Sequence, residues 1–475
     1  MAKAITHTTE RSQLSAANWI LLVVAVASFT VLAISVPHLI SDQGWFAGAR
    51  AGEKFLFVAL IAYLGASVLY GSSVALRQAE LLQGAVLLSR GGLLLHTMAI
   101  LARWSSSGHA PLSDIYEMVL VFSWAVVALH VLAEWKLKLP FLGAITLPLA
   151  ALALILMQVL PGEIRPLVPA LQSTWLQVHV TLAMLSYAGF TISFAVALLY
   201  LIKDGVTPRN FLTWCAALVV GVYGTIVATC VNGSMALTIA AWDPIARQKV
   251  MLAPRQALLV PLESLGWPFV MALALAAATL VLNLLATFSD RPERWGKIVR
   301  WAFLAALGAQ ALALVLLLVK VNGGPHFLAE YAQGFEVRLV DSPFLLAGVA
   351  TALFASLAWK VLDWKYDSIV GYLPSRDSLD NLIYKTVAIS FPLLTFMIIA
   401  GAYWANRTWG AYWSWDPKED WALITWLTYA GYIHMRLTRG WRGRRSAYFA
   451  IIGFGVVMFT FFGVTYLLPG LHAYA

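Results

Sequence analysis

The residues with the clearest chemical potential are tryptophans in the segment 404–434. Six occur there, and several crowd a short polar stretch that contains Asp416, Lys418 and Glu419. The six are Trp404, Trp409, Trp413, Trp415, Trp421 and Trp426. A tryptophan often marks a membrane–water boundary, because its amphipathic ring suits the headgroup region. So dense a cluster exceeds what anchoring requires, and it predicts a broad aromatic surface for a flat, apolar, ring-shaped ligand such as haem.

Histidine is the second informative residue type, because two neutral imidazoles can hold the iron of haem axially. His179 lies four residues after Trp175, at the start of one apolar run, and His472 lies within four residues of the end of the last one. Both are expected at the membrane surface that carries the tryptophans. Taken singly, each could be an interfacial side chain hydrogen-bonded to water. Their convergence with the tryptophans favours a pair of iron ligands.

Further histidines are expected inside the membrane. His434 lies thirteen residues beyond Trp421, which is ~20 Å along a helix. An ionisable residue at that depth is a functional candidate by default. His96 and His130 also fall within apolar runs. For all of them, the alternative is a hydrogen bond between helices.

The polar residues of the tryptophan segment leave two interpretations open. Lys418 or Arg407 could neutralise a carboxylate of the ligand through a charge-assisted hydrogen bond, or both could be solvated at the rim. Asp416, followed by Pro417, could contact the ligand directly, or it could shape a turn and cap the next helix.

A membrane-embedded helical fold must position these residues. The chain has 475 residues, of which 61% are hydrophobic and 12% charged, unlike a soluble domain. Apolar runs of about 20 residues recur, long enough to cross the ~30 Å hydrocarbon layer as helices, and their continuity excludes a barrel. The sequence predicts an all-α polytopic membrane protein with about 13 transmembrane helices. Their expected ranges are 18–40, 54–76, 85–103, 114–135, 139–160, 175–202, 210–231, 264–287, 301–320, 343–362, 381–403, 421–438 and 446–468.

The basic residues predict the orientation of these helices. With the N-terminus in the cytoplasm, groups of Lys and Arg at 291–300 and 436–445 fall in inner segments, as the positive-inside rule requires. The C-terminus is then extracytoplasmic. The net charge of +9 accordingly indicates topology and attraction to anionic membrane lipid. No basic stripe interleaved with exposed aromatics indicates nucleic-acid binding.

The signatures divide the chain into four predicted parts. Residues 1–53 hold an N-terminal span and loop, whereas 54–203 and 372–475 hold most of the unusual motifs. Residues 204–371 have the character of generic membrane helices. The two cysteines lie 15 residues apart in one expected span, and no CxxC or CxxCH occurs. The chain itself is therefore neither a thiol–disulfide carrier nor a c-type cytochrome.

Several motifs carry a resemblance to a known family. The segment WGAYWSWDPKEDWALITW resembles the "WWD" signature of haem-handling proteins in cytochrome c biogenesis. Residues 108–124, GHAPLSDIYEMVLVFSW, and 167–187, LVPALQSTWLQVHVTLAMLSY, resemble segments of the CcsA/ResC family, as does the C-terminal FGVTYLLPGLHAY. Over 54–203 and 372–475 the chain is similar to the CcsA/ResC component of the system II cytochrome c synthase. The region 204–371 departs from the family pattern through additional spans.

The resemblance implies roles for individual residues. His179 and His472 match two external histidines that ligate haem b, and His434 matches an intramembrane haem ligand. The matching WWD segment adds further binding candidates, namely Trp409, Trp413, Trp415, Asp416 and Trp421. The opposing intramembrane ligand is expected from a CcsB/ResB-type partner, with His96 or His130 as alternatives.

The activity implied by the resemblance is holocytochrome c synthesis (haem lyase), which joins haem vinyl groups to the two thiols of a CxxCH motif in a secreted apocytochrome c. The nucleophilic sulfurs belong to that substrate, so this chain would supply positioning. It would work with a CcsB/ResB-type partner in the bacterial plasma (inner) membrane, with its site facing the periplasm or exterior. A haem exporter or chaperone that serves a separate ligase is the alternative. A third class is a secondary transporter or a quinone-linked redox subunit with structural tryptophans. Paired broken helices in two related halves would indicate it, and none is evident in the sequence.

Overall fold

The computed structural model describes most of the chain beyond its N-terminal region. The described residues are 52–137, 139–157, 166–231, 262–289, 292–322 and 343–468, with shorter pieces at 160, 162, 164, 239–243, 248–250, 336–339 and 470. The long helices are α2 (Glu53–Leu76), α3 (Ala79–Ser107), α4 (Ile115–Leu137), α5 (Gly143–Met157), α6 (Thr174–Lys203), α7 (Pro208–Val231), α8 (Leu262–Thr287), α9 (Pro292–Asn322), α11 (Pro343–Tyr372), α12 (Arg376–Trp409), α13 (Pro417–Thr438) and α14 (Arg444–Met458). Short helical turns are η1 (Pro140–Leu142), η2 (Pro169–Leu171), the π-helical η4 (Phe459–Gly463) and α15 (Val464–Leu467).

The predicted helical membrane architecture is confirmed. Each expected span except 18–40 falls on a helix, and 18–40 lies outside the described residues. Within the described part of the chain, 10 helices are long and apolar enough to cross a membrane. Helix α13 is not among them, because polar residues such as His434 and Arg436 interrupt its apolar run, and α11 is not among them over the part that the structure describes in full. The chain is an integral membrane protein, while the count of thirteen spans and their orientation stay predictions.

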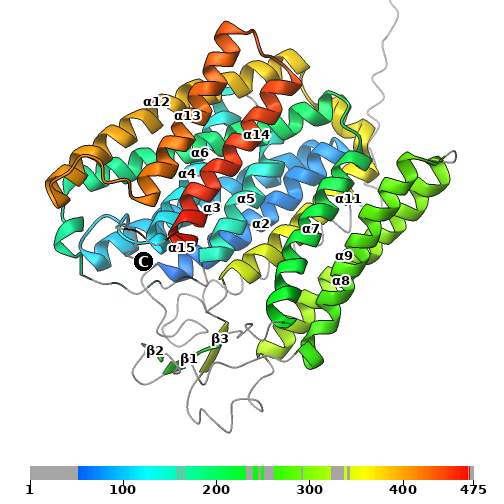
Figure 1. Cartoon of the computed structure of the whole chain (residues 1–475), viewed down its shortest axis with the longest axis horizontal. Helices are drawn as coiled ribbons and strands as arrows, with labels where there is room; N and C mark the ends of the chain where they lie inside the picture. The colour runs from blue at the N-terminus through cyan, green and yellow to red at the C-terminus, as the bar shows by residue number, and fades with distance from the viewer. Residues whose placement is uncertain are drawn as a thin grey trace, which may run out of the picture.

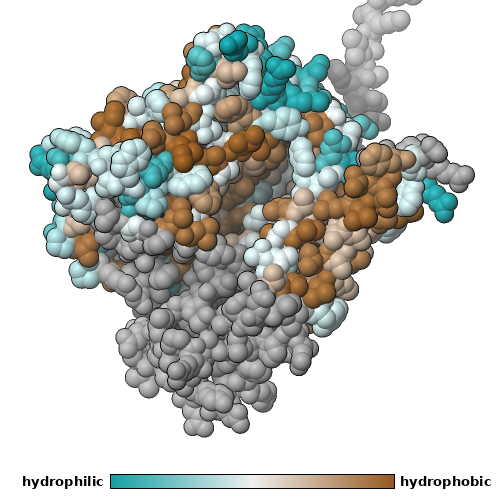
Figure 2. Space-filling view, viewed as in Figure 1, coloured by the Kyte–Doolittle hydropathy of each residue, from teal (hydrophilic) through white to brown (hydrophobic). Residues whose placement is uncertain are grey.

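The outer surfaces of the helices suit a lipid environment. Ile389 and Phe396 on α12 are 69% and 59% exposed, and Leu284 on α8 and Ile452 on α14 are 61% and 64% exposed. Figure 2 shows hydrophobic surface along the flanks of the helices, with hydrophilic residues gathered at the turn between α13 and α14. Lipid can solvate such apolar side chains without cost, so their exposure needs no partner protein.

The main body combines both motif-rich parts of the sequence in one core. Buried residues of α2 to α6 pack with those of α12 to α14, and α6 and α12 form the most extensive helix pair. Gly189 on α6 permits this close approach, because a Cβ there would overlap the Ser390 hydroxyl of α12. At the far end, Asp380 of α12 forms a 2.7 Å ion pair with Arg436 of α13. These contacts fix the three helices that carry the tryptophan segment and His179.

The helices of residues 204–371 form a second core. Helices α7, α8 and α9 pack with the first half of α11 around buried residues such as Phe303 and Trp359. The Trp359 indole Nε1 also donates to the Pro208 carbonyl over 2.9 Å. The second half of α11 buries Leu362 and Ile369 in the main core. Helix α11 therefore joins the two groups of helices, which lie side by side in Figure 1.

A small sheet departs from the purely helical prediction. Strands β1 (Ile239–Asp243), β2 (Gln248–Val250) and β3 (Glu336–Leu339) form an antiparallel sheet in the order β2-β1-β3. Ala240 pairs with Arg338 in its register. The strands come from the two longest connections between expected spans, outside the membrane, where water can hydrate the open edges that lipid forbids.

Candidate functional site

The tryptophan segment is mostly helical, with a short loop at its centre. Helix α12 continues to Trp409 and ends at Gly410, whose φ of 80° is readily adopted by glycine. Asp416 then caps α13 in a capping box with Glu419, in which each side chain accepts a hydrogen bond from the other residue's backbone. This arrangement supports the capping interpretation of Asp416 and fixes the direction in which α13 leaves the loop.

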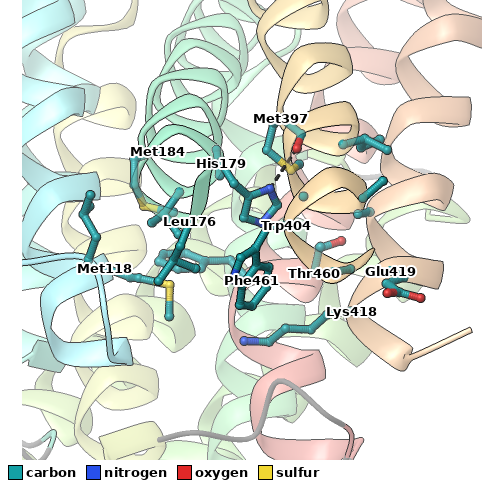
Figure 3. Close-up of a pocket in the computed structure, with 18 of the residues that line it drawn as sticks. Met118, Leu176, His179, Met184, Met397, Trp404, Lys418, Glu419, Thr460 and Phe461 are labelled. Atoms are coloured by element: carbon teal, nitrogen blue, oxygen red, sulfur yellow. Dashed lines mark hydrogen bonds between the residues drawn. The ribbon is translucent and has the colours of Figure 1, made fainter. Parts of the chain in front are cut away.

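A pocket opens where α6, α12, α13 and the start of α4 converge (Figure 3). The space between its walls is about 1160 Å³ when the open mouth and the adjoining solvent are included. The π-helical turn η4 contributes Phe461 to the wall, and the loop contributes Tyr412 and Trp413. Aromatic and aliphatic side chains dominate the lining, so the pocket favours a flat apolar ligand.

His179 lies in this pocket with its ring held from one side. Its Nδ1 is 2.8 Å from the backbone carbonyl oxygen of Met397, as the dashed line in Figure 3 marks. A carbonyl only accepts, so Nδ1 carries the proton in the neutral ring and the lone pair resides on Nε2. The ring also stacks on Trp404, with centroids 6.2 Å apart and planes 23° apart. Such an outer hydrogen bond is the device that orients histidine as a metal ligand.

Gly401 makes the approach of this ring possible. A Cβ built there would lie 2.6 Å from His179 Cε1 and Nδ1. Glycine inside an apolar helix often marks such a close approach. Gly401, inside an apolar run, is therefore a sequence signal for this contact. The carbonyl of Met397 could not be found in this way, because a backbone acceptor has no side-chain signature.

We expect Gly401→Ala to displace the His179 ring and to weaken ligand binding at this pocket about tenfold, because small misplacements of a binding group are costly. Titration of the purified chain with haem, followed by absorption, measures the change. Gly455→Ala is the matched control, since a Cβ on this α14 glycine meets nothing within 4 Å. An unchanged haem affinity in Gly401→Ala would contradict the assigned ring position.

The predicted aromatic residues occupy different positions around the pocket. Trp413 lines it, and its buried Nε1 has no hydrogen-bond partner within the described residues. Trp409 packs edge-on against Trp404 with centroids 4.8 Å apart, behind the pocket wall. Trp421 packs on Phe459 of η4 at 4.2 Å.

Trp415 is the outlier of the cluster. It is 72% exposed and has a φ of 58°, a left-handed conformation that is uncommon for an aromatic residue. Its ring stands edge-on to Trp413, with centroids 6.1 Å apart. Within the cluster, Trp404 and Trp413 therefore belong to the pocket wall, whereas Trp415 is exposed. The rings do not form one continuous flat surface.

His472 lies outside the described residues, so its predicted ligand role stays a prediction. Gly470, two residues earlier, is among the described residues. It lies so close to Asp416 that a Cβ on it would overlap the Asp416 carboxylate. Thr465 of the same C-terminal segment lines the pocket. The C-terminal motif and the tryptophan segment thus meet at the same end of the molecule.

The structure does not bring His434 to this pocket. His434 lies near the C-terminal end of α13, away from the pocket, and it is exposed on the helix surface. His96 on α3 and His130 on α4 are fully buried elsewhere in the main body. Neither α3 nor α4 packs appreciably against α13, so neither histidine faces His434.

The buried histidines differ in their local bonding. His96 Nδ1 is 3.2 Å from the Tyr63 hydroxyl of α2, which fits the alternative interpretation of a hydrogen bond between helices. His130 has no hydrogen bond to either ring nitrogen within the described residues. Its Nε2 is 3.7 Å from a Glu134 carboxylate oxygen, and Tyr70 meets its ring edge-on.

The motif at 108–124 forms the rim of the pocket opposite the tryptophans. Asp114, just before α4, lines the pocket and accepts the Glu117 backbone N–H at 2.8 Å. Burial raises the pKa of the Asp114 carboxyl to about 6, with the nearby Glu117 charge adding to the effect. Arg103 of α3 donates to Glu117 over 2.9 Å in an almost fully buried ion pair. The pair fixes this rim against α3.

Comparison with known proteins gives a consistent assignment. Residues 112–472 match the family described as cytochrome C assembly protein. The chain is 32% identical over 422 residues to the cytochrome c biogenesis protein CcsA of Synechococcus sp. (strain JA-3-3Ab), covering 88% of this chain and 93% of that protein. It is 30% identical over 377 residues to CcsA of Microcystis aeruginosa (strain NIES-843 / IAM M-2473), covering 78% and 81% respectively. CcsA of Picosynechococcus sp. (strain ATCC 27264 / PCC 7002 / PR-6) is 33% identical over 377 residues, covering 78% and 82%.

Proposed function

The chain belongs to the cytochrome C assembly protein family, and we propose that it binds haem b in the His179 pocket and presents it for covalent attachment to an apocytochrome c. The predicted setting is the bacterial plasma membrane, with the pocket on the periplasmic or exterior side. Haem is a substrate in this reaction. The activity is that of a system II holocytochrome c synthase acting with a CcsB/ResB-type partner.

The orientation of His179 is the observation that carries this proposal. The Met397 carbonyl accepts a hydrogen bond from Nδ1–H, and a neutral imidazole with this tautomer presents the Nε2 lone pair that iron binds. Trp404 and Gly401 flank the ring and hold its plane. An aromatic wall beside an oriented imidazole suits a porphyrin, whose face stacks while its iron is ligated.

The second axial ligand in this proposal is His472. Its support is the contact between Gly470 and Asp416, which brings the C-terminal segment to the loop beside the pocket. Two imidazoles would limit the access of oxygen and other ligands to the iron. The histidine of the substrate CxxCH motif would then displace one of them and bring its thiols beside the vinyl groups.

The contribution of this chain to the chemistry is positional. In each attachment the thiol adds across a vinyl group, so that sulfur bonds to one vinyl carbon and hydrogen to the other. No net oxidation or reduction occurs in that addition. Holding the vinyl-bearing edge and the substrate thiols within contact distance turns a bimolecular encounter into an effectively unimolecular step.

His434 suits an earlier haem position in this proposal. It is exposed on α13, and neither of the buried alternatives, His96 and His130, lies on a helix that packs against α13. A ligand on a separate CcsB/ResB-type chain is therefore the better candidate for the opposite side of that haem. We expect His434→Ala to reduce the haem that co-purifies with the chain by about half, since the outer pocket is left intact. Pyridine haemochrome assay of the purified protein measures it, with His7→Ala as a control in the N-terminal tail.

Co-expression tests the proposed activity against its alternative. The chain and its partner are produced with a CxxCH apocytochrome in cells that lack other biogenesis genes. Haem-stained cytochrome that survives denaturing electrophoresis supports thioether formation. Haem-loaded protein without covalent cytochrome would instead favour an exporter or chaperone. Purified protein without a bis-histidine haem spectrum would exclude both and reopen a transporter or redox role.

A further inference from the structure

The pocket wall carries charged side chains whose partners can be compared. They are Asp114, Lys418 and Glu419. Asp114 is satisfied by protein groups: one carboxylate oxygen accepts the Glu117 backbone N–H at 2.8 Å, and the other lies 3.8 Å from Arg103 Nη2. Both of its carboxylate oxygens therefore have protein neighbours before any ligand enters.

Glu419 also has hydrogen-bond partners within the protein. One carboxylate oxygen accepts the backbone N–H of Ser414 at 2.7 Å and that of Asp416 at 3.2 Å, and the Ser414 hydroxyl at 3.1 Å. These bonds close the loop before α13. That oxygen, which already accepts from three donors, has little capacity left for a ligand.

Lys418 differs from both. Within the described residues its ammonium has no hydrogen bond or ion pair, although its backbone N–H donates to Asp416 over 3.0 Å. The side chain extends from α13 into the pocket that holds His179 and Trp404 (Figure 3). Burial lowers the pKa of Lys418 to about 8, and the Asp416 carboxylate only partly opposes the effect. A partly buried cation without a close counter-charge is costly, and a bound anion reduces that cost.

Arg407, the other cation considered for this role, points elsewhere. Its guanidinium donates to the Tyr403 hydroxyl over 2.8 Å and lies 5.1 Å from the centre of that ring. It is exposed and does not line the pocket. The structure thus separates two residues that the sequence left equivalent.

We infer that Lys418 is a specificity-determining residue that binds a carboxylate of the porphyrin and selects a porphyrin with free acid side chains. This inference rests on the proposed function. The two propionates of haem b lie on neighbouring pyrrole rings and the vinyl groups on the other two. A carboxylate held at Lys418 therefore turns the vinyl-bearing edge away from α13. Both the choice of porphyrin and its orientation then follow from one ammonium group.

Esterification of the porphyrin carboxylates tests this inference by changing the ligand, so that the result does not depend on whether a protein variant folds. The full chain in detergent, carrying His434→Ala so that only the outer pocket is counted, is titrated with haem and with haem dimethyl ester. We expect haem to bind at least about tenfold more tightly than the diester, as a charge-assisted hydrogen bond predicts. Lys418→Met should lower haem affinity by the same factor and leave diester affinity unchanged. Lys418→Arg should retain most of the preference, and Arg407→Gln should retain all of it.

The pH dependence of binding gives an independent readout. Below about pH 8 the ammonium is already protonated, so Lys418 should add no pH dependence to haem affinity there. Above pH 8 the amine must take up a proton on binding, so affinity should fall as the pH rises, by up to about tenfold per unit. The diester and the Lys418→Met variant should lack this fall, and Lys418→Arg should remain level. The other titratable groups that line the pocket are Asp114, His179, Tyr187, Tyr412 and Glu419, and they are common to all these variants.

The outcomes separate the inference from the proposed function. Equal affinity of the otherwise unaltered chain for haem and its diester overturns the inference, as does an unchanged preference in Lys418→Met. In either case haem still binds, and the proposed function stands. If neither porphyrin binds to the pocket, the proposed function fails and the role of Lys418 fails with it.

Discussion

Replacement of His179 by alanine is expected to remove haem from the outer pocket and to lower the yield of holocytochrome c by about 100-fold or more. The substitution deletes the imidazole that the Met397 carbonyl orients over the pocket. The aromatic walls would remain, but they cannot fix the iron or the rotation of the ring about it. The absorption spectrum of the purified variant reports the lost ligand, and haem staining of the cytochrome reports the lost product.

His109→Ala is a matched control for this substitution. His109 also places its Nδ1 against a backbone carbonyl, that of Ala110 at 3.0 Å, yet it does not line the pocket. It should mature cytochrome normally. Free imidazole should restore part of the activity of His179→Ala by occupying the vacated position. Normal maturation by His179→Ala would show that the iron ligand has been wrongly assigned.

Replacement of Glu117 by alanine is expected to destabilise the protein by about 3 kcal/mol. The Arg103 and Glu117 side chains are only 3% and 1% exposed, and they are 2.9 Å apart. Removal of the carboxylate leaves a buried guanidinium with a weaker partner in Asp114, at 3.8 Å. It also removes the acceptor for the Ser113 hydroxyl and backbone N–H. Unfolding of the purified chain by a denaturing detergent, followed by tryptophan fluorescence, measures the change.

Two comparisons isolate the buried pair. Glu80→Ala removes an exposed carboxylate near the start of α3 and should alter stability by less than about 0.5 kcal/mol. The double replacement of Arg103 and Glu117 by methionine should cost less than Glu117→Ala, because no unpaired charge remains. A Glu117→Ala protein as stable as the unaltered chain would show that the pair does not hold the rim in solution.

Apolar runs predicted the helices well because lipid leaves few alternatives. A backbone inside hydrocarbon must satisfy its own hydrogen bonds, so a run such as 175–202 has to be a helix wherever it packs. The structure places α6 over Thr174–Lys203. No such constraint acts on the connections outside the membrane, and there the helical prediction missed the strands β1, β2 and β3.

Residue type also predicted which segments would meet, although not how. His179 and the tryptophan segment are more than two hundred positions apart, and the structure brings them into one pocket. The prediction treated the tryptophans as one surface. In the structure Trp404 stacks on His179, while Trp415 is exposed at the tip of the loop. Composition cannot distinguish these positions, because every indole carries the same propensity for a membrane boundary.

The sequence by itself determined that this is a helical membrane protein and that it belongs among cytochrome c assembly proteins. The length of an apolar run and the order of residues in a motif are local properties of the chain. Only the tertiary structure decided the tautomer of His179, the clearance that Gly401 provides, and the choice of Lys418 over Arg407 as the cation in the pocket. These depend on atoms from different helices within a few ångströms of each other. Such proximity is a consequence of packing, and no single segment encodes it.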